Sequence, residues 1–221
     1  MMNGSLDPGL IVIRTTLEAT LKAPFSVALT STQPGDGKSA TAVGLARCFA
    51  DAGYRTAIVD ANPMNPSIGQ ALGVGVLAAP RSLETVTALR MTSAAPNLDA
   101  GSIADASLLQ ATSSSALRSF AADLRGLYAV TIWDTGNLFG DALSIQCATA
   151  CDGVLIVVRY GRRVVPDDAR IVATLEQVGA NVIGIVPTGY PGGGTNGAGR
   201  NALSGSGSVR PSLELGRVGK S

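Results

Sequence analysis

The sequence predicts an α/β fold, with a mostly parallel sheet and helices on both faces of it. Short apolar segments rich in Val, Ile and Leu alternate with amphipathic segments along the 221 residues, which is typical of buried parallel strands joined by crossover helices. The first strand, the next helix and the second strand form a unit of about 35 residues, the length of a βαβ motif. A glycine-rich loop separates that first strand from its helix.

The individual elements follow from the same alternation. Near-continuous β-branched or apolar stretches predict about six strands, at residues 25–30, 56–59, 97–100, 129–133, 154–158 and 182–186. Apolar residues at helical spacing predict helices between them, at residues 10–21, 40–51, 67–72, 113–124, 141–150 and 167–178, with a weaker one at 82–89. Pro166 suits the first turn of the last helix.

The composition changes at Pro191, where a Gly/Ser-rich segment with few apolar residues begins. We therefore expect a domain over residues 1–190, with a loose arm at 1–9, and a flexible tail at 191–221. The basic residues of the tail are interpreted as a solvated end rather than as a lipid contact.

Bulk composition excludes several classes of protein. Hydrophobic residues make up 46% of the chain, but no apolar segment approaches the ~20 residues of a membrane span. The N-terminus lacks a signal-peptide pattern, so we expect a cytoplasmic protein. A net charge of +1 gives no basic field for nucleic acid. The chain has no histidine, which excludes Ser-His-Asp and Cys-His catalysis.

The three cysteines fit free thiols in a reducing compartment. Cys147 and Cys151 are four residues apart and could share one helix face. Two thiols without histidine make an incomplete zinc site. We interpret them as buried thiols.

The loop between the first strand and its helix predicts a phosphate cradle. This phosphate loop comprises residues 32–39 and ends in Gly37, Lys38 and Ser39. Backbone N–H groups and the helix N-terminus attract phosphates, Lys38 reaches the outer phosphates, and the Ser39 hydroxyl suits Mg²⁺, as in P-loop NTPases. The residues expected to bind the nucleotide, ATP, are Pro34, Gly35, Asp36, Gly37, Lys38, Ser39 and Ala40.

Two carboxylates follow predicted strands at the same edge of the sheet. Asp60 follows the second strand and Asp134 follows the 129–133 strand, and ligands of parallel sheets bind at the carboxyl ends of strands. Asp134 has the Walker B arrangement, which holds Mg²⁺ through water. Asp60 either supports the metal and accepts a proton, or caps the turn at 62–66. The predicted catalytic residues are Lys38, Asp60 and Asp134, and the predicted metal ligands are Ser39, Asp60 and Asp134.

Several motifs together resemble a known family. They are the segments 14–17 (RTTL), 34–39 (PGDGKS), 60–67 (DANPMNPS), 134–135 (DT), 152–159 (DGVLIVVR) and 179–186 (GANVIGIV). In this order they resemble the bacterial tyrosine kinases, which are deviant-Walker ATPases alongside the MinD/ParA family, and the resemblance runs through most of residues 8–190. Gln33 stands where the MinD/ParA branch carries its signature lysine, which favours the kinase branch.

The resemblance implies a fold, an activity and partners. It implies a P-loop fold and an ATP- and Mg²⁺-dependent protein-tyrosine kinase that regulates the polymerisation and export of capsular or exopolysaccharide. Because the chain has no membrane segment of its own, the resemblance also implies a separate membrane partner, a chain-length or co-polymerase protein. Such a partner would hold the protein at the inner face of the membrane.

Departures from the family pattern keep a second hypothesis open. Asn62 and Met64 stand where the family has a second Asp and an Arg, and Tyr190 alone stands where the tail has a tyrosine cluster. Of the N-terminal oligomerisation pattern, which would need Glu at Pro8 and Arg at Ile11, Arg14 is present, so homo-oligomerisation stays open. The alternative is a catalytically weakened, ATP-dependent regulatory switch, either a pseudo-kinase or a MinD/ParA-like ATPase, that acts by binding a membrane partner.

Overall fold

Seven strands form one sheet within residues 7–140 and 142–189, the part of the chain that the computed structural model describes. Their order across the sheet is β3-β4-β2-β5-β1-β6-β7, and every neighbouring pair is parallel except the antiparallel β3 and β4. The strands are β1 (Phe25–Ser31), β2 (Thr56–Ala61), β3 (Thr92–Ala95), β4 (Leu98–Ser102), β5 (Val130–Asn137), β6 (Gly153–Arg159) and β7 (Val182–Thr188). The predicted α/β class and the mostly parallel sheet are confirmed.

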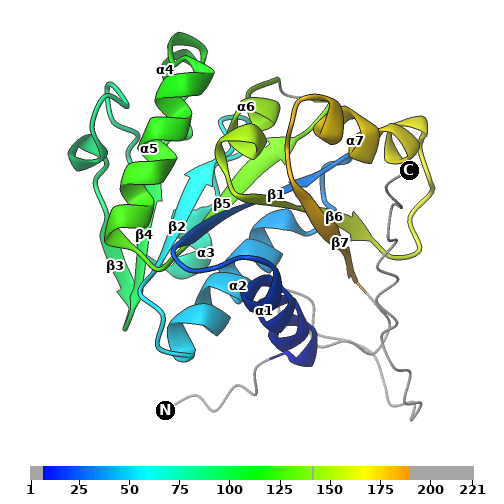
Figure 1. The fold of residues 1–221 in the computed structure, drawn as a ribbon, viewed down its shortest axis with the longest axis horizontal. Helices are drawn as coiled ribbons and strands as arrows, with labels where there is room; N and C mark the ends of the chain where they lie inside the picture. The colour runs from blue at the N-terminus through cyan, green and yellow to red at the C-terminus, as the bar shows by residue number, and fades with distance from the viewer. Residues whose placement is uncertain (1–6, 141, 190–221) are drawn as a thin grey trace.

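Helices cover both faces of this sheet (Figure 1). The helices are α1 (Pro8–Thr20), α2 (Lys38–Asp51), α3 (Ile68–Leu72), α4 (Ala106–Ala111), α5 (Ser114–Leu127), α6 (Ala142–Ala150) and α7 (Pro166–Gln177). Helices α1, α2 and α3 pack on one face, and α4 to α7 pack on the other. Pro166 is the first residue of α7, as predicted.

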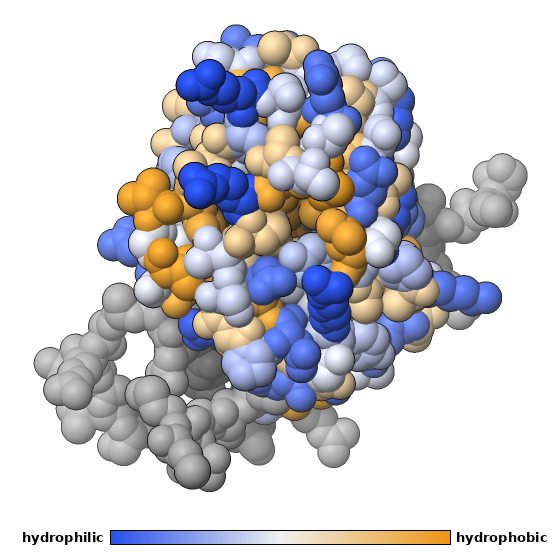
Figure 2. All heavy atoms as spheres, turned by 90° about the vertical axis from the view of Figure 1, so that its left-hand side faces the viewer, coloured by the Kyte–Doolittle hydropathy of each residue, from blue (hydrophilic) through white to orange (hydrophobic). Residues whose placement is uncertain are grey.

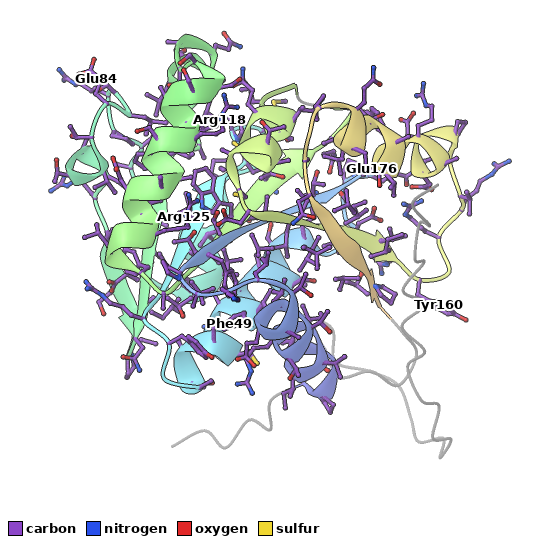
Figure 3. The ribbon with its side chains drawn as sticks, viewed as in Figure 1. Phe49, Glu84, Arg118, Arg125, Tyr160 and Glu176 are labelled. Carbon is purple, nitrogen blue, oxygen red and sulfur yellow. The ribbon has the colours of Figure 1, made fainter. Side chains whose placement is uncertain are left out.

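Alternating strand residues build two cores, one on each face of the sheet. Val27 and Leu29 of β1 join the core under α1 and α2, whereas Ala28 joins the core under α5 and α6. Phe49 of α2 lies inside the first core and meets the Phe25 ring edge-on at 5.8 Å between centroids. Figure 3 shows it among buried side chains, while Glu84 and Tyr160 extend from the periphery.

Trp133 anchors the second core. It is fully buried in β5, immediately before Asp134, and its ring meets the ring of Phe120 of α5 edge-on at 6.2 Å between centroids. Burial of an aromatic pair of this kind stabilises a core beyond its area alone. This packing fixes the part of β5 that carries the predicted metal ligand Asp134.

The structure corrects three details of the predicted elements. The expected helix at 82–89 is wrong, because this segment holds one short 3₁₀ turn, η1 (Val86–Ala88). The strand β3 and the helix α4 were not predicted. The four β3 residues, Thr-Ser-Ala-Ala, are small and mostly exposed, so they lack an apolar pattern. Asn97 adopts a positive φ of 61° in the turn that returns the chain into β4.

The N-terminal boundary also differs from the prediction. The expected loose arm at 1–9 is wrong at Pro8 and Gly9, which begin α1, because the Asp7 side chain caps the helix by accepting the Gly9 N–H at 2.9 Å. The predicted tail at 191–221, Asp141 at the expected start of α6, and residues 1–6 lie outside the described residues. The division at residue 190 stays a prediction.

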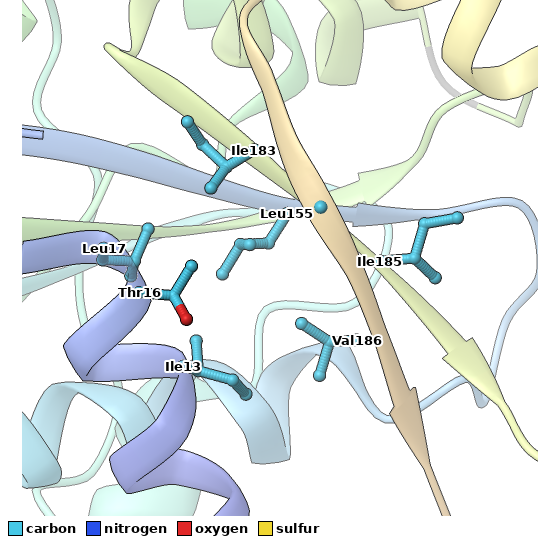
Figure 4. Close-up of a pocket in the computed structure, with 8 residues that line it drawn as sticks. Ile13, Thr16, Leu17, Leu155, Ile183, Ile185 and Val186 are labelled. Carbon is cyan, nitrogen blue, oxygen red and sulfur yellow. The ribbon is translucent and has the colours of Figure 1, made fainter. Parts of the chain in front are cut away.

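One face of the molecule carries small apolar groups among charged ones. On the face that carries α4, α5 and β3, hydrophobic residues are interspersed with charged ones (Figure 2). A small hollow lies between α1 and β7, and except for Thr16 its lining is apolar, with no predicted site residue in it (Figure 4). Among the described helices, none has the length and hydropathy needed to cross a bilayer.

The predicted buried thiols are confirmed. Cys48, Cys147 and Cys151 are all buried and free of disulfides. Burial raises the pKa of the Cys151 thiol well above its usual range. A thiol held protonated in this way is a poor nucleophile and a poor metal ligand.

Candidate nucleotide-binding site

The phosphate loop turns sharply from β1 into α2. Gly35 and Gly37 adopt positive φ values of 81° and 94°, which side chains rarely tolerate. A Cβ on Gly37 would also come within 3.1 Å of the Thr188 hydroxyl, at the end of β7. Because α2 begins at Lys38, two residues earlier than predicted, its free N–H groups face the loop. The predicted binding residues Pro34 to Ala40 therefore form this turn and the first turn of α2.

Lys38 is buried at the base of the loop. Its ammonium donates to the Ser31 Oγ at 2.9 Å and to the Asn137 Oδ1 at 2.6 Å. Burial lowers the pKa of Lys38, and the nearby charges of Asp134 and Asp36 oppose that shift. The lysine is thus held at the strand ends by neutral acceptors, with its charge balanced at longer range.

Asp134 lies inside β5, because the parallel ladder continues past it to Asn137 rather than ending at Trp133 as predicted. It is fully buried, and among the described residues neither carboxylate oxygen has a hydrogen-bond partner. Burial raises the pKa of Asp134 to about 7. The Ser39 hydroxyl, which is near the carboxylate but does not reach it with full hydrogen-bond geometry, and the Lys38 charge oppose the rise, and the Asp60 charge adds to it. A buried carboxylate without partners is unfavourable unless a cation or a proton joins it.

Asp60 lies beside Asp134 in register on β2, one residue before the strand ends. Its surroundings differ, because its Oδ1 accepts the Asn62 N–H at 3.2 Å and its Oδ2 accepts the N–H groups of Ser67 at 2.8 Å and Ile68 at 3.0 Å. Burial raises the pKa of Asp60 and these N–H groups oppose the shift. Asp60 therefore caps the turn that leads into α3, which is one of its two predicted roles.

Asn62 is buried beside this pair. Its side-chain Oδ1 has no hydrogen-bond partner within the described part of the chain. An amide oxygen of this kind remains available to a ligand or a water.

These donors fit a magnesium ion bound together with a nucleotide. The described residues hold no group of three Asp, Glu, Cys or His side chains that could bind a metal alone. Mg²⁺ at nucleotide sites needs fewer protein ligands, because phosphates and water complete its octahedron. The partnerless oxygens of Asp134 and the Ser39 hydroxyl match that requirement.

Arg162 forms a polar cluster with residues of the phosphate loop and of α7. The sequence did not reveal this cluster. The Arg162 Nε donates to the Asp36 Oδ1 at 2.8 Å, and its two terminal nitrogens bind the carboxylate of Asp168 at 2.6 and 2.7 Å. Arg162 also donates to the Thr32 hydroxyl at 2.8 Å, and Thr32 in turn contacts Asp168. The Arg162 side chain is 12% exposed and that of Asp36 is 1% exposed, so this ion pair is largely out of water.

The same cluster ties the loop to α7. The Arg162 guanidinium holds the pKa of Asp168 well below its usual range, and the two carboxylates raise the pKa of Arg162. Asp168 also accepts the Val165 N–H at 2.9 Å at the start of α7. In the sequence, Arg162 and Arg163 are an adjacent basic pair, and the acidic residues Asp167 and Asp168 early in α7 were the available signal.

Asn137 is the second functional candidate that sequence reasoning missed. It lies at the end of β5, in register with Ser31 of β1. A polar residue three positions after the Walker B aspartate was a usable signal, but its contact with Lys38 joins residues 99 positions apart.

A glycine-rich turn from a buried strand into a helix, with a buried lysine and a strand-borne aspartate, defines a P-loop nucleotide-binding domain. A family model described as the CobQ/CobB/MinD/ParA nucleotide binding domain (CbiA) matches residues 27–205. The match spans most of the chain, and the chain belongs to this family.

Among known proteins, a segment of 39 residues is 46% identical to tyrosine-protein kinase CpsD of Streptococcus pneumoniae. The segment covers 18% of this chain and 17% of CpsD, so the chain matches well under two thirds of that relative. This likeness is local.

Solved structures share the fold at low identity. The kinase domain of Escherichia coli tyrosine kinase ETK superposes with a TM-score of 0.70 at 16% identity, over 88% of this chain and 78% of that one. The VpsO kinase domain gives 0.64 at 21% identity, over 80% and 94%. Cobyrinic acid a,c-diamide synthase from Mycobacterium smegmatis, with bound ADP and magnesium, gives 0.63 at 20% identity, over 75% and 74%. The predicted P-loop fold is confirmed.

Proposed function

We propose that this chain binds ATP with Mg²⁺ and acts as a protein-tyrosine kinase of the bacterial type. The observation that carries the proposal is that one end of the sheet holds both a buried Lys38 at the start of α2 and the partnerless carboxylate of Asp134. The local identity to a tyrosine-protein kinase and the shared fold of the ETK and VpsO kinase domains support it.

Each residue has a role in this proposal. The loop N–H groups at 34–40 bind phosphates, and Lys38 neutralises the outer ones. Ser39 and Asp134 would hold Mg²⁺, which supplies charge neutralisation on the transferred phosphoryl group. Asp60 would orient this end of the site and take the proton of the attacking tyrosine hydroxyl. The new bond joins that oxygen to the γ-phosphorus, and the bond from the γ-phosphorus to ADP breaks.

The proposed setting is the regulation of exopolysaccharide or capsule export through a membrane partner of the chain-length type. Its support is the motif resemblance. In that setting the chain works on the cytoplasmic side and reaches the membrane through the partner.

The test is a phosphorylation assay with γ-labelled ATP and Mg²⁺, with and without the cytoplasmic segment of the partner. We expect label on tyrosine, and we expect Lys38→Ala to remove nucleotide binding. Tight ATP binding by the Lys38→Ala variant would contradict the phosphate cradle.

A second candidate is a nucleotide switch that binds ATP, turns it over slowly and acts through its partner. One observation favours it: at the end of β2, Asp60 is engaged by three backbone N–H groups, and its neighbour is the neutral Asn62. ATP binding together with a complete absence of phosphotyrosine on both proteins would favour the switch over the kinase.

A further inference from the structure

The ammonium of Lys38 rests in a small polar triangle. The Asn137 Oδ1 lies 2.6 Å from the Lys38 Nζ and 3.1 Å from the Ser31 Oγ, and the Ser31 Oγ lies 2.9 Å from the same Nζ. An ammonium can only donate, so the amide of Asn137 must turn its oxygen towards the lysine. The side chain of Asn137 is therefore oriented by its contact with Lys38.

The triangle is uncharged apart from the lysine. No carboxylate of the described residues forms an ion pair with Lys38 within 4.0 Å. Two of the three donors of the ammonium are assigned to Ser31 and Asn137, which leaves one for a ligand. Neutral acceptors hold the cation in place without cancelling the charge that a phosphate would meet.

We propose that Asn137 is a positioning residue that fixes the Lys38 ammonium for the outer phosphates of a nucleotide. The inference rests on the proposed function and deepens it, because it names the residue that sets how strongly the site separates triphosphate from diphosphate. Asn137 acts through Lys38 and touches no nucleotide itself.

The geometry separates this role from ordinary strand termination. Asn137 ends β5 with its backbone, whose carbonyl accepts the Gly140 N–H at 3.2 Å, and that bond survives a change of side chain. Among the described residues, the hydrogen bonds of this half-buried side chain are to Lys38 and Ser31. A side-chain variant therefore tests the lysine contact and leaves the turn intact.

The experiment compares three variants of the full chain: Asn137→Ala, Asn137→Asp and the control Asn181→Asp. Asn181 is exposed and donates to the Asp152 carbonyl at the amino ends of β6 and β7, whereas Asn137 lies at the carboxyl end of β5, so this control adds the same charge away from the site. Affinities for ATP and ADP, both with Mg²⁺, are measured by calorimetry. Thermal unfolding of the nucleotide-free proteins is followed in parallel.

Asn137→Ala should weaken ATP binding about tenfold, the usual effect of losing one hydrogen bond to a charged group. Asn137→Asp keeps the shape, pairs with Lys38 and repels phosphates. It should weaken ATP binding by more than Asn137→Ala does, and by a larger factor for ATP than for ADP. Asn181→Asp should bind both nucleotides as the unchanged chain does.

The outcomes distinguish the two proposals. Failure of the unchanged chain to bind ATP would defeat the proposed function itself. If the unchanged chain binds and Lys38→Ala does not, wild-type affinity in both Asn137 variants would overturn this inference alone. Equal losses for ATP and ADP, together with a lowered unfolding temperature in Asn137→Asp, would likewise overturn it, because they indicate damage to the loop.

Discussion

The two walls of the candidate site differ in whether their buried charges are paired. On the phosphate-loop wall, Arg162 pairs with Asp36 and Asp168 in a largely buried cluster, in which the Asp36 Oδ2 has no hydrogen-bond partner among the described residues but its charge is matched. On the facing wall, at the ends of β2 and β5, Asp134 and the side-chain oxygen of Asn62 lack partners within the described residues. A wall whose charges are paired holds its shape without a ligand, whereas the other wall gains stability when a cation arrives. The difference indicates that the phosphate loop is shaped before a ligand arrives, whereas the ends of β2 and β5 are completed by a cation.

Removing the partnerless charge should have the largest effect. Burial raises the pKa of Asp134 from its ordinary value of 3.8 to about 7, so the folded state holds the proton more tightly than the unfolded state. The contribution of protonated Asp134 to the stability of the fold is therefore fully present below pH 3.8, and it is lost as the pH rises through the folded-state pKa of about 7. Asp134→Asn should stabilise the ligand-free protein at pH 8 by at most about 4 kcal/mol.

The same variant should bind Mg²⁺–ATP about tenfold to 100-fold more weakly, because a metal-orienting carboxylate is lost. Urea unfolding at pH 8 and pH 4 measures the first effect, and calorimetry measures the second. Asp123→Asn, on the exposed side of α5, is the control and should change neither. A less stable Asp134→Asn protein at pH 8 would refute the picture of an uncompensated buried charge.

Removing Arg162 from the phosphate-loop wall should lower the free energy of unfolding, the opposite of the effect of Asp134→Asn. Arg162→Gln leaves Asp36 buried without its cation and should destabilise the protein by about 3 kcal/mol at pH 7. Arg162 holds the pKa of Asp168 below its ordinary value of 3.8. The stability that this pair contributes is therefore fully present above pH 3.8, and it is lost as the pH falls through the lowered pKa of the folded state. Arg163→Gln, exposed and next in sequence, should leave the free energy of unfolding unchanged. Equal effects of the two variants would mean that the cluster adds no stability.

Asp60 provides the matched comparison within the facing wall. Asp60→Asn is the same chemical change as Asp134→Asn. In the unchanged protein, however, the Asp60 carboxylate accepts hydrogen bonds from backbone N–H groups, and the variant turns an amide NH₂ group, itself a donor, towards some of them. It should destabilise the protein by about 2 kcal/mol. Unfolding by urea at pH 8 measures both variants side by side. Stabilisation by both would show that the bonds of Asp60 to the turn contribute little.

The smallest effect is expected at Asn62. Asn62→Asp adds a second acid beside Asp60 and should raise phosphoryl transfer or ATP hydrolysis roughly tenfold, below the full contribution of a general base because Asp60 is already present. A steady-state turnover assay at saturating Mg²⁺–ATP measures this. Asn65→Asp, exposed in the same turn, is the control and should leave turnover unchanged. Unchanged turnover in Asn62→Asp would remove the argument that the amide weakens catalysis.

The sequence predicted what depends on local pattern. Continuous Val and Ile stretches located the central strands, and the Gly37-Lys38-Ser39 spacing located the loop. The edge strand β3 was missed because its small, exposed residues carry no periodicity. Buried strands can be recognised from their apolar composition, whereas an exposed edge strand such as β3 cannot.

The site shows the same limit. Lys38 and Asp134 could be predicted as site residues because their motifs are local. Arg162 and Asn137 were missed because their roles arise from contacts across 126 and 99 positions, which depend on the strand order. The engagement of Asp60 with Ser67 and Ile68 was foreseen only as the alternative of a turn cap, since sequence alone does not show where a carboxylate oxygen points.

The burial of Trp133 has a practical consequence. It is the single tryptophan of the chain, it is fully shielded from water, and it adjoins Asp134 along β5. Its fluorescence arises from one known place in the core, against Phe120. The emission therefore provides a label-free optical signal that shifts when water reaches this core, and one cuvette can rank the stabilities of all the variants above.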